Sequence, residues 1–182
     1  LVAVNTSKTR AEPTGKLVVV DIASRTVVGE HPLPGQPDSI AISKDGQWAA
    51  VVIENERDED VNDGALPQLP GGSVVVVSTK AERPADWTLR PVELTGLAER
   101  FPEDPEPEYV DINADNVAVV TLQENNHIVL VDLKTASIIR HFPAGTVDLN
   151  AIDATDERPN QVAFSESQPG VLREPDGVTW IS

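Results

Sequence analysis

The chain has 182 residues, enough for one domain with a sizeable core, and it is strongly acidic: 14 lysines and arginines against 30 aspartates and glutamates give a formal charge of −16. This charge argues against nucleic acid or an anionic membrane surface as a partner, because phosphate groups would be repelled. The absence of cysteine excludes disulfides and thiolate sites. No run of about 18 apolar residues occurs, so no membrane insertion is expected. The start at Leu1 rather than methionine predicts a processed or partial chain.

Short stretches rich in valine and isoleucine recur along the chain. In chain order they are residues 17–22, 48–53, 74–77, 117–122 and 128–133, and glycine, proline, asparagine or aspartate lies near most of their ends. Such runs indicate β-strands that are partly buried on both faces. The best helix candidate is a turn or two around residues 94–99. The sequence therefore predicts an all-β protein.

The predicted strands also recur in a fixed order. The segments PDSIAIS (37–43), PEYVDIN (107–113) and PDGVTWIS (175–182) each place an acid after a proline and then alternate hydrophobic positions. Their acids, Asp38, Glu108 and Asp176, are separated by 70 positions (38 to 108) and 68 positions (108 to 176). A second strand that ends in Glu-Asn follows the first two segments. A third and a fourth strand repeat in residues 16–33 and 127–144, and GGSVVVVSTK is a divergent copy of the third.

Four antiparallel strands per repeat are the signature of a β-propeller blade. A β-sandwich is the alternative, but it does not require strand-for-strand recurrence. The predicted boundaries are residues 1–36 for the end of one blade, 37–106 for a second blade with an acidic insertion at 54–72, 107–174 for a third blade with a long loop at 145–174, and 175–182 for the first strand of the next. About three blades are fewer than the ~4–8 of a closed propeller. We therefore expect a partial propeller that either belongs to a larger one or pairs its open edges with another chain.

Acidic and amide side chains gather at one end of the predicted blades. The start of each first strand and the end of its antiparallel second strand lie at the same face, around the channel mouth. The residues that this geometry brings there are Asp38 with Glu54 and Asn55, Glu108 with Glu124 and Asn125, and Asp176. Calcium prefers oxygen ligands of this kind, so the pattern predicts a calcium site. The alternative is a structural role, because acids at strand starts also cap turns or lie in solvent.

The insertion IENERDEDVNDGALPQLPGG holds six carboxylates between Glu54 and Asp63. Asp58-x-Asp60-x-Asn62 resembles the start of a calcium loop, with oxygen ligands on alternate residues. The sixth position is Asp63 rather than glycine and the twelfth is Leu69 rather than glutamate, so the segment is not an EF-hand. An irregular calcium loop and a charged, solvated insertion both remain open.

Other chemical motifs are sparse. His31, His127 and His141 lack metal-ligand spacing to one another and are expected at strand ends or on the surface. No nucleophile elbow, Walker loop or dinucleotide fingerprint occurs. Arg173 precedes the last predicted strand, where it either faces an anionic ligand or pairs with Glu174.

The segments IENERDEDVNDGALPQLP, TLQENNHIVLVDL and REPDGVTWIS resemble a family of bacterial secreted or periplasmic propellers called phytase-like, or "esterase-like activity of phytase". They are also similar to choice-of-anchor surface propellers, which share the LQENN and REP-type segments. The resemblance covers most of the chain and implies export and phosphoester hydrolysis with calcium. Together with the channel-mouth geometry it gives these candidates: for the metal Asp38, Glu54, Asn55, Glu56, Asp58, Asp60, Glu108, Glu124, Asn125 and Asp176, and for a ligand Asn126, Arg173 and Glu174.

Two functions follow as hypotheses. The first is an exported, periplasmic or extracellular bacterial propeller that serves as a non-catalytic scaffold or ligand-binding module, with structural calcium. The alternative is a calcium-dependent phosphoesterase, similar to phytase or alkaline phosphatase, that acts on phosphomonoesters. The expected partner is accordingly a protein or a phosphorylated small molecule. Because the predicted face is mostly acidic, metal would have to bind there before a phosphate could. No catalytic residue is assigned.

Overall fold

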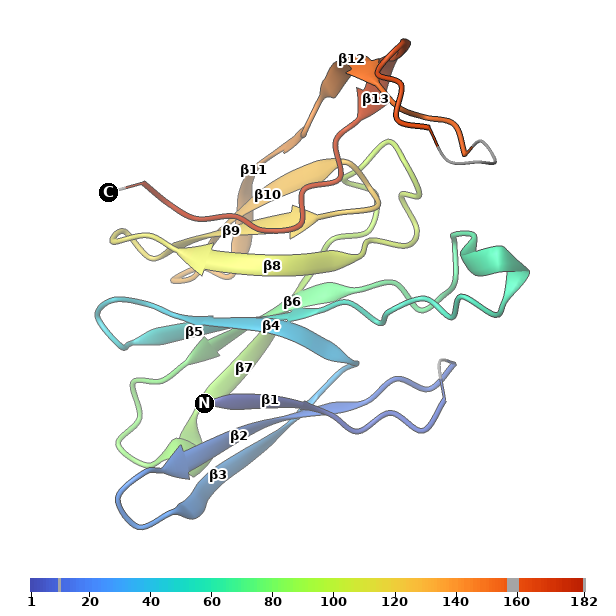
Figure 1. Ribbon diagram of the computed structural model, residues 1–182. Coiled ribbons are helices and arrows are strands. Elements are labelled where there is room, and N and C mark those ends of the chain that lie inside the picture. The colour runs from blue at the N-terminus through green and yellow to red at the C-terminus, as the bar shows by residue number, and fades with distance from the viewer. Residues whose placement is uncertain (10, 157–160, 182) are drawn as a thin grey trace.

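The computed structural model describes residues 1–9, 11–156 and 161–181, and it is almost entirely β-structure. Successive antiparallel sheets stack along the molecule, as Figure 1 shows. Only two short 3-10 turns interrupt them in this part of the chain, η1 (Asn62–Gly64) and η2 (Pro84–Asp86). The all-β prediction is confirmed.

The two central sheets are complete four-stranded blades. One has the order β4 (Pro37–Ile42), β5 (Trp48–Ile53), β6 (Ser73–Ser78) and β7 (Thr88–Glu93). The next has the order β8 (Pro107–Ile112), β9 (Val117–Leu122), β10 (His127–Asp132) and β11 (Ser137–Pro143). Every neighbouring pair is antiparallel, so both sheets are simple meanders. Repeated four-stranded meanders define a β-propeller.

A three-stranded sheet precedes them. It consists of β1 (Val2–Asn5), β2 (Gly15–Asp21) and β3 (Thr26–Leu33), in that order. Its β2–β3 hairpin corresponds to the third and fourth strands of the other sheets, so β1 takes the place of a second strand. The sheet therefore lacks a first strand, and the described chain is a partial propeller.

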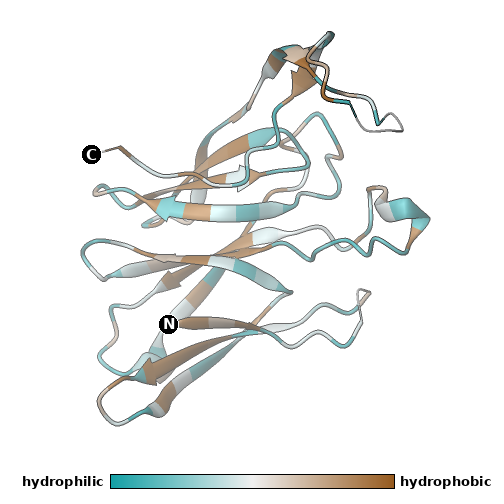
Figure 2. Ribbon diagram, in the orientation of Figure 1, coloured by the Kyte–Doolittle hydropathy of each residue, from teal (hydrophilic) through white to brown (hydrophobic). Residues whose placement is uncertain are grey.

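The core forms because β5 and β6 bury side chains on both faces. Val51 and Val75 pack in the cluster shared with the first sheet, whereas Val52 and Val74 pack in the cluster shared with the third. All four side chains are at most 1% exposed. In Figure 2 the strands are mainly hydrophobic and many of the connections between them are hydrophilic. The valine runs are uninterrupted because both faces of this sheet are covered, so the valines of these strands are all buried.

The C-terminal region differs from the expected long loop. Residues 145–174 contain a two-stranded antiparallel hairpin, β12 (Thr146–Ile152) and β13 (Glu166–Leu172). Residues 173–181 then run back along the third sheet without a strand assignment. The expected strand at 175–182 is therefore not formed over its described residues, although its position beside the sheet is that of a next first strand (Figure 1). Residue 182 lies outside the described residues.

Candidate functional site

Seven carboxylates lie within interaction range of one another where the first strands begin and the second strands end. We call them the carboxylate face; its members are Asp38, Glu54, Glu56, Glu106, Glu108, Glu124 and Asp176. They come from the starts of β4 and β8, from the segments that follow β5 and β9, and from the C-terminal segment. The antiparallel geometry expected from the repeat thus brings Asp38 towards Glu54. Glu106 was absent from the expected set.

Crowding and burial disfavour ionisation at this face. Burial raises the pKa of Glu54 to about 8, and the charges of Asp38 and Glu106 add to the rise. Glu108 behaves in the same way: burial and then the neighbouring Asp176 raise its pKa to about 7. The Gln123 amide, oriented to donate, contacts the Glu108 carboxylate. The face therefore holds protons that ordinary surface acids would have lost at neutral pH.

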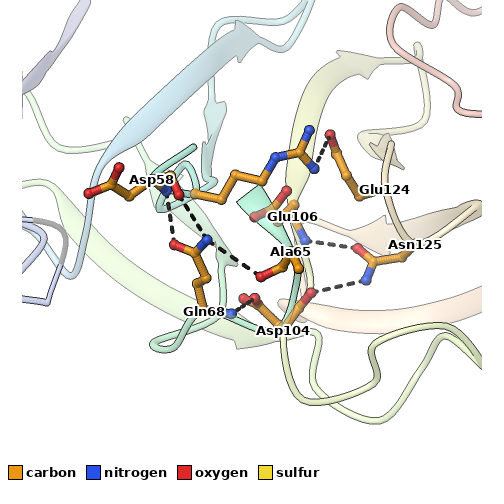
Figure 3. A network of polar contacts seen from close by, with 8 residues as sticks. Asp58, Ala65, Gln68, Asp104, Glu106, Glu124 and Asn125 are labelled. Atoms are coloured by element: carbon orange, nitrogen blue, oxygen red, sulfur yellow. Dashed lines mark hydrogen bonds and ion pairs between the residues drawn. The ribbon is translucent and has the colours of Figure 1, made fainter. Parts of the chain in front are cut away.

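Glu106 is the most buried member of the carboxylate face, and the half-buried Glu124 lies beside it. Glu106 is 1% exposed, and its carboxyl group is in hydrogen-bonding contact with that of Glu124. Burial, followed by the charges of Glu124 and Asp104, raises the pKa of Glu106 to about 8. Arg57 acts in the opposite direction, since its Nη1 lies 3.2 Å from Glu124 Oε1. Figure 3 shows Glu124 and Glu106 side by side in this network. With its pKa at about 8, Glu106 keeps a proton at neutral pH.

Asn55 and Asn125, both expected as metal ligands, bind the backbone in the structure. Asn55 Oδ1 accepts from Gln36 N at 2.9 Å, and Asn125 Oδ1 accepts from Glu106 N at 2.9 Å. Their Nδ2 groups donate to loop carbonyls, those of Pro70 and Gly71 for Asn55 and those of Arg100, Phe101 and Asp104 for Asn125. We call these two side chains the asparagine brackets, because each ties the entry of its own blade to a loop: the β5–β6 insertion for Asn55 and the β7–β8 connection for Asn125. Their repeat spacing therefore has a structural reason.

The acidic insertion is an ordered loop closed around one buried side chain. Gln68 Nε2 donates to the carbonyls of Asp58 and Val61, at 3.0 and 3.2 Å, and its Oε1 accepts from Asp58 N at 2.9 Å. Gln68 N donates to Asp104 Oδ2 at 2.6 Å, which ties the loop to the following connection (Figure 3). The Asp58 carboxylate accepts from Asp60 N at 2.9 Å. The start of the calcium-loop pattern thus forms a turn within the loop, and the mainly hydrophilic η1 follows it.

The residues expected to bind a ligand lie at the base of the β12–β13 hairpin. Asn126, with its amide oriented to donate, lies 2.9 Å from the carbonyl of Arg173 and 3.1 Å from that of Gly145. Arg173 Nη1 donates to Ala144 O at 3.1 Å. Asn126 and Arg173 therefore hold the hairpin to the third blade. Glu174 is exposed and lines a neighbouring cavity instead.

Two cavities open beside the carboxylate face. One of about 380 Å³ lies between the insertion and the connection after β7, and its charged lining consists of Arg57, Arg100, Glu124 and Glu174. The other, of about 410 Å³, has a more apolar lining that includes Leu97, Pro143 and Leu172. Arg100 lines both. Arginines thus reach this acidic region from the insertion, through Arg57, and from the β7–β8 connection, through Arg100.

The geometry of a metal cage is absent from the part of the chain that the structure describes. No group of three or more histidine, aspartate or glutamate side chains is arranged there to hold a metal ion. The carboxylate face offers charge and oxygen atoms, but it does not offer a preformed coordination sphere. The calcium site stays a prediction that this arrangement does not favour.

The histidines form one contact that their spacing did not reveal. His127 Nε2 and His141 Nδ1 are 2.9 Å apart, across the paired strands β10 and β11. Burial and then the neighbouring His141 lower the pKa of His127. His31 instead contacts the Pro84 carbonyl at 2.9 Å, which joins the first sheet to η2. Strand pairing, rather than sequence distance, brings His127 and His141 together.

The repeated meanders define a partial β-propeller whose sheets share an acidic end. The family model of the choice-of-anchor I domain matches residues 1–182, so the chain belongs to this family. The choice-of-anchor part of the predicted resemblance is confirmed. The phytase-like part of the resemblance is not supported by this family model. The family and the fold together indicate a surface-associated β-propeller. Within the described residues, no helix has the length and apolar character needed to cross a membrane.

Solved structures show similarity at low sequence identity. Hydrazine synthase of Kuenenia stuttgartiensis is 15% identical, with a TM-score of 0.52, over 72% of this chain and 36% of that chain. A luciferin-regenerating enzyme is 15% identical, with a TM-score of 0.47, over 72% of this chain and 37% of that chain. The β-propeller domain of Cps50 (Swd1) from Myceliophteria thermophila is 10% identical, with a TM-score of 0.31, over 92% of this chain and 74% of that chain. The chain thus spans about a third of the length of the first two. No curated protein matches it significantly.

Proposed function

We propose that the protein is a non-catalytic binding propeller of the bacterial periplasm or cell exterior, and that its carboxylate face takes a cationic group of a partner protein. The observation that carries this proposal is the crowding of Glu54, Glu106 and Glu108, whose pKa values are raised to about 8, 8 and 7. A bound positive charge would relieve this repulsion and displace the held protons.

A lysine or arginine side chain fits these observations better than a calcium ion. Calcium needs six to eight oxygen ligands around one point, and the described acids do not converge in that way. An ammonium or guanidinium group needs only a few oxygen acceptors and a negative potential. The formal charge of −16 supplies a long-range attraction for such a partner.

The proposal is tested by calorimetric titration with a tetralysine peptide, with tetraglutamate and calcium chloride as parallel titrants. We expect tetralysine to bind, and binding to weaken at least about tenfold in Glu54→Gln/Glu108→Gln, equivalent to about 1.4 kcal/mol. The matched control is Glu82→Gln/Asp115→Asn, which removes two exposed acids at the opposite ends of the sheets. Equal affinity in the two double variants, or no binding by the unmodified protein, would refute the proposal. If calcium binds more tightly than tetralysine, a calcium site would replace the cationic-partner site as the explanation of the carboxylate face.

The calcium-dependent phosphoesterase is a second candidate. The observation in its favour is the cavity of about 380 Å³, in which Arg57 and Arg100 could hold a phosphate group beside the carboxylate face. Its test is release of nitrophenol from p-nitrophenyl phosphate with and without calcium. Turnover that requires calcium and is lost in Arg100→Ala would favour this function. If p-nitrophenyl phosphate is not hydrolysed with or without calcium, the phosphoesterase is refuted and the binding propeller stays as the proposed function.

A further inference from the structure

One cavity at the acidic end of the blades has a different charge balance from the carboxylate face beside it. This cavity of about 380 Å³, which we call the arginine cavity, lies between the insertion and the β7–β8 connection. Its charged lining consists of two basic and two acidic side chains, Arg57, Arg100, Glu124 and Glu174. Its volume is in the range of cavities that bind small ligands. The arginine cavity is therefore suited to a ligand that carries both signs of charge.

Arg100 is the basic residue of this cavity that has no carboxylate partner. Among the described residues, no ion pair includes Arg100. Its half-buried guanidinium lies over the ring of Phe101 instead, 5.1 Å from the ring centre. A guanidinium that stacks on a ring keeps the N–H groups at its edge free for other acceptors. Because a carboxylate accepts two parallel N–H bonds from a guanidinium, Arg100 is suited to bind a carboxylate ligand.

The backbone that carries Arg100 is held in a strained conformation. Phe101 has a φ of 49°, in the left-handed region that a bulky side chain rarely adopts. The carbonyls of Arg100 and Phe101 accept from Asn125 Nδ2 at 3.1 and 3.3 Å, so one of the asparagine brackets fixes this turn. Strain of this kind persists where the surroundings enforce it, and it gathers at binding sites. The turn therefore holds Arg100 at the cavity before any ligand arrives.

Glu124 belongs both to the arginine cavity and to the carboxylate face. It lines the cavity, where its Oε1 lies 3.2 Å from Arg57 Nη1. The carboxyl groups of Glu106 and Glu108 are within interaction range of it, and Figure 3 shows Glu106 at its side. Glu106 Oε1 is buried and accepts no hydrogen bond within the described chain. A cation bound at Glu124 and Glu108 would therefore lie next to the cavity that offers Arg100 to an anion.

A basic residue with a free α-carboxylate carries both charges on one small framework. In lysine a flexible stem of four carbons separates the ammonium group from the α-carbon, so its two charged ends can reach neighbouring sites. A lysine inside a polypeptide lacks the carboxylate and would bring its positive charge close to Arg57 and Arg100 without compensation. The two arginines therefore select against a ligand that is only cationic.

We propose that the arginine cavity binds the α-carboxylate of a basic residue whose side-chain cation lies against the carboxylate face. Arg100, with Arg57 across the cavity, would donate to the carboxylate, and Glu124 and Glu108 would accept from the cation. The inference rests on the proposed function, because it specifies which cationic group the carboxylate face takes. Two sources offer this chemistry: the C-terminus of a polypeptide that ends in lysine or arginine, and the free amino acid.

The test compares two peptides that differ only at the carboxylate, acetyl-Gly-Gly-Lys and its C-terminal amide, by calorimetric titration at physiological salt. We expect the acid to bind at least about tenfold more tightly than the amide. Arg100→Gln should remove this difference by weakening the binding of the acid, without weakening that of the amide. The matched control is Arg83→Gln, which changes an exposed arginine before η2, at the opposite end of the second sheet, and should keep the difference.

The outcomes separate this inference from the proposed function. Equal affinities for the acid and the amide would overturn the inference, and as long as tetralysine binds they leave the proposed function in place. A difference that persists in Arg100→Gln would also overturn it. If no cationic titrant binds, the proposed function fails and the inference fails with it. Free lysine, titrated in parallel, distinguishes the two sources: an affinity at least equal to that of the peptide acid assigns the site to the amino acid, and a lower affinity assigns it to the end of a polypeptide.

Discussion

The carboxyl pair of Glu106 and Glu124 predicts that replacing Glu106 by glutamine stabilises the protein at alkaline pH. The amide of Glu106→Gln is uncharged and can donate to Glu124, as the held proton does now. The pKa of Glu106 is about 8 in the folded chain, against an ordinary value of 4.5. Between these values the unfolded chain binds fewer protons than the folded one, so stability falls as pH rises from about 4.5 through about 8.

The size of the effect follows from the same shift. One pKa unit corresponds to about 1.4 kcal/mol, and the full shift would therefore be worth several kcal/mol. The pKa of about 8 already includes the opposing charge of Arg57, and a buried glutamine amide keeps part of the burial cost, so we expect Glu106→Gln to gain about 2 kcal/mol above pH 8. This corresponds to a rise in Tm of about 4–8 °C for a chain of this size. Below pH 4.5 the gain should vanish, because both forms of the protein are then uncharged at this position.

Thermal and urea unfolding, followed by tryptophan fluorescence between pH 4 and 9, measure this difference. Glu103→Gln is the matched control, since Glu103 is exposed on the same connection. The control should keep the decline of stability with pH, whereas Glu106→Gln should flatten it. A parallel decline in both variants would refute the held proton at this pair.

Three further predictions concern single positions. Gly72→Ala should cost more than about 3 kcal/mol of unfolding free energy, because a Cβ there would overlap the Ile53 carbonyl oxygen, whereas Gly177→Ala, which meets open space, should cost less than about 0.5. Asn125→Ala should cost about 2–4 kcal/mol in urea unfolding, since it leaves several buried backbone groups without their bracket. His127→Gln should protect the protein in acid: the lowered pKa of His127 means that the folded chain binds fewer protons than the unfolded one, so stability is lost as pH falls below about 6.5. Tm measured at pH 5 and 7.5 checks this, and an unchanged difference between the two would contradict it.

The repeat made most of the fold predictable. The runs at 48–53 and 117–122 coincide with β5 and β9. Continuous apolar runs of this length are typical of strands in a sheet that is covered on both faces. The β12–β13 hairpin could not be predicted in this way. Its second strand, ESQPGVL, has a proline and a glycine in the middle and is mostly exposed, so it shows no hydrophobic alternation.

The candidate site was predictable only in its position. The phase of the repeat correctly directs Asp38 and Glu108 to one end of the sheets, because antiparallel pairing fixes which strand ends meet. It cannot distinguish a side chain that faces the channel from one that binds the backbone. The repeated Glu-Asn pair has the second role: in each copy the residue directly before the first-strand proline, Gln36 before Pro37 and Glu106 before Pro107, donates its N–H to the asparagine. Glu106 was missed because its burial results from contacts between segments far apart in the sequence, such as its N–H bond to Asn125.

The bracket at Asn55 has a consequence for protein engineering. Because Asn55 holds the carbonyls of Pro70 and Gly71, the insertion is closed at its base before it leaves the sheet. The blade strands on either side are already positioned at that point, independently of what the loop contains. Residues 59–66 thus form a replaceable segment, because the flanking Arg57 and Gln68 keep their contacts with Glu124 and Asp104. A library built between Asp58 and Pro67 would vary recognition at the acidic end of the blades while the scaffold stays constant.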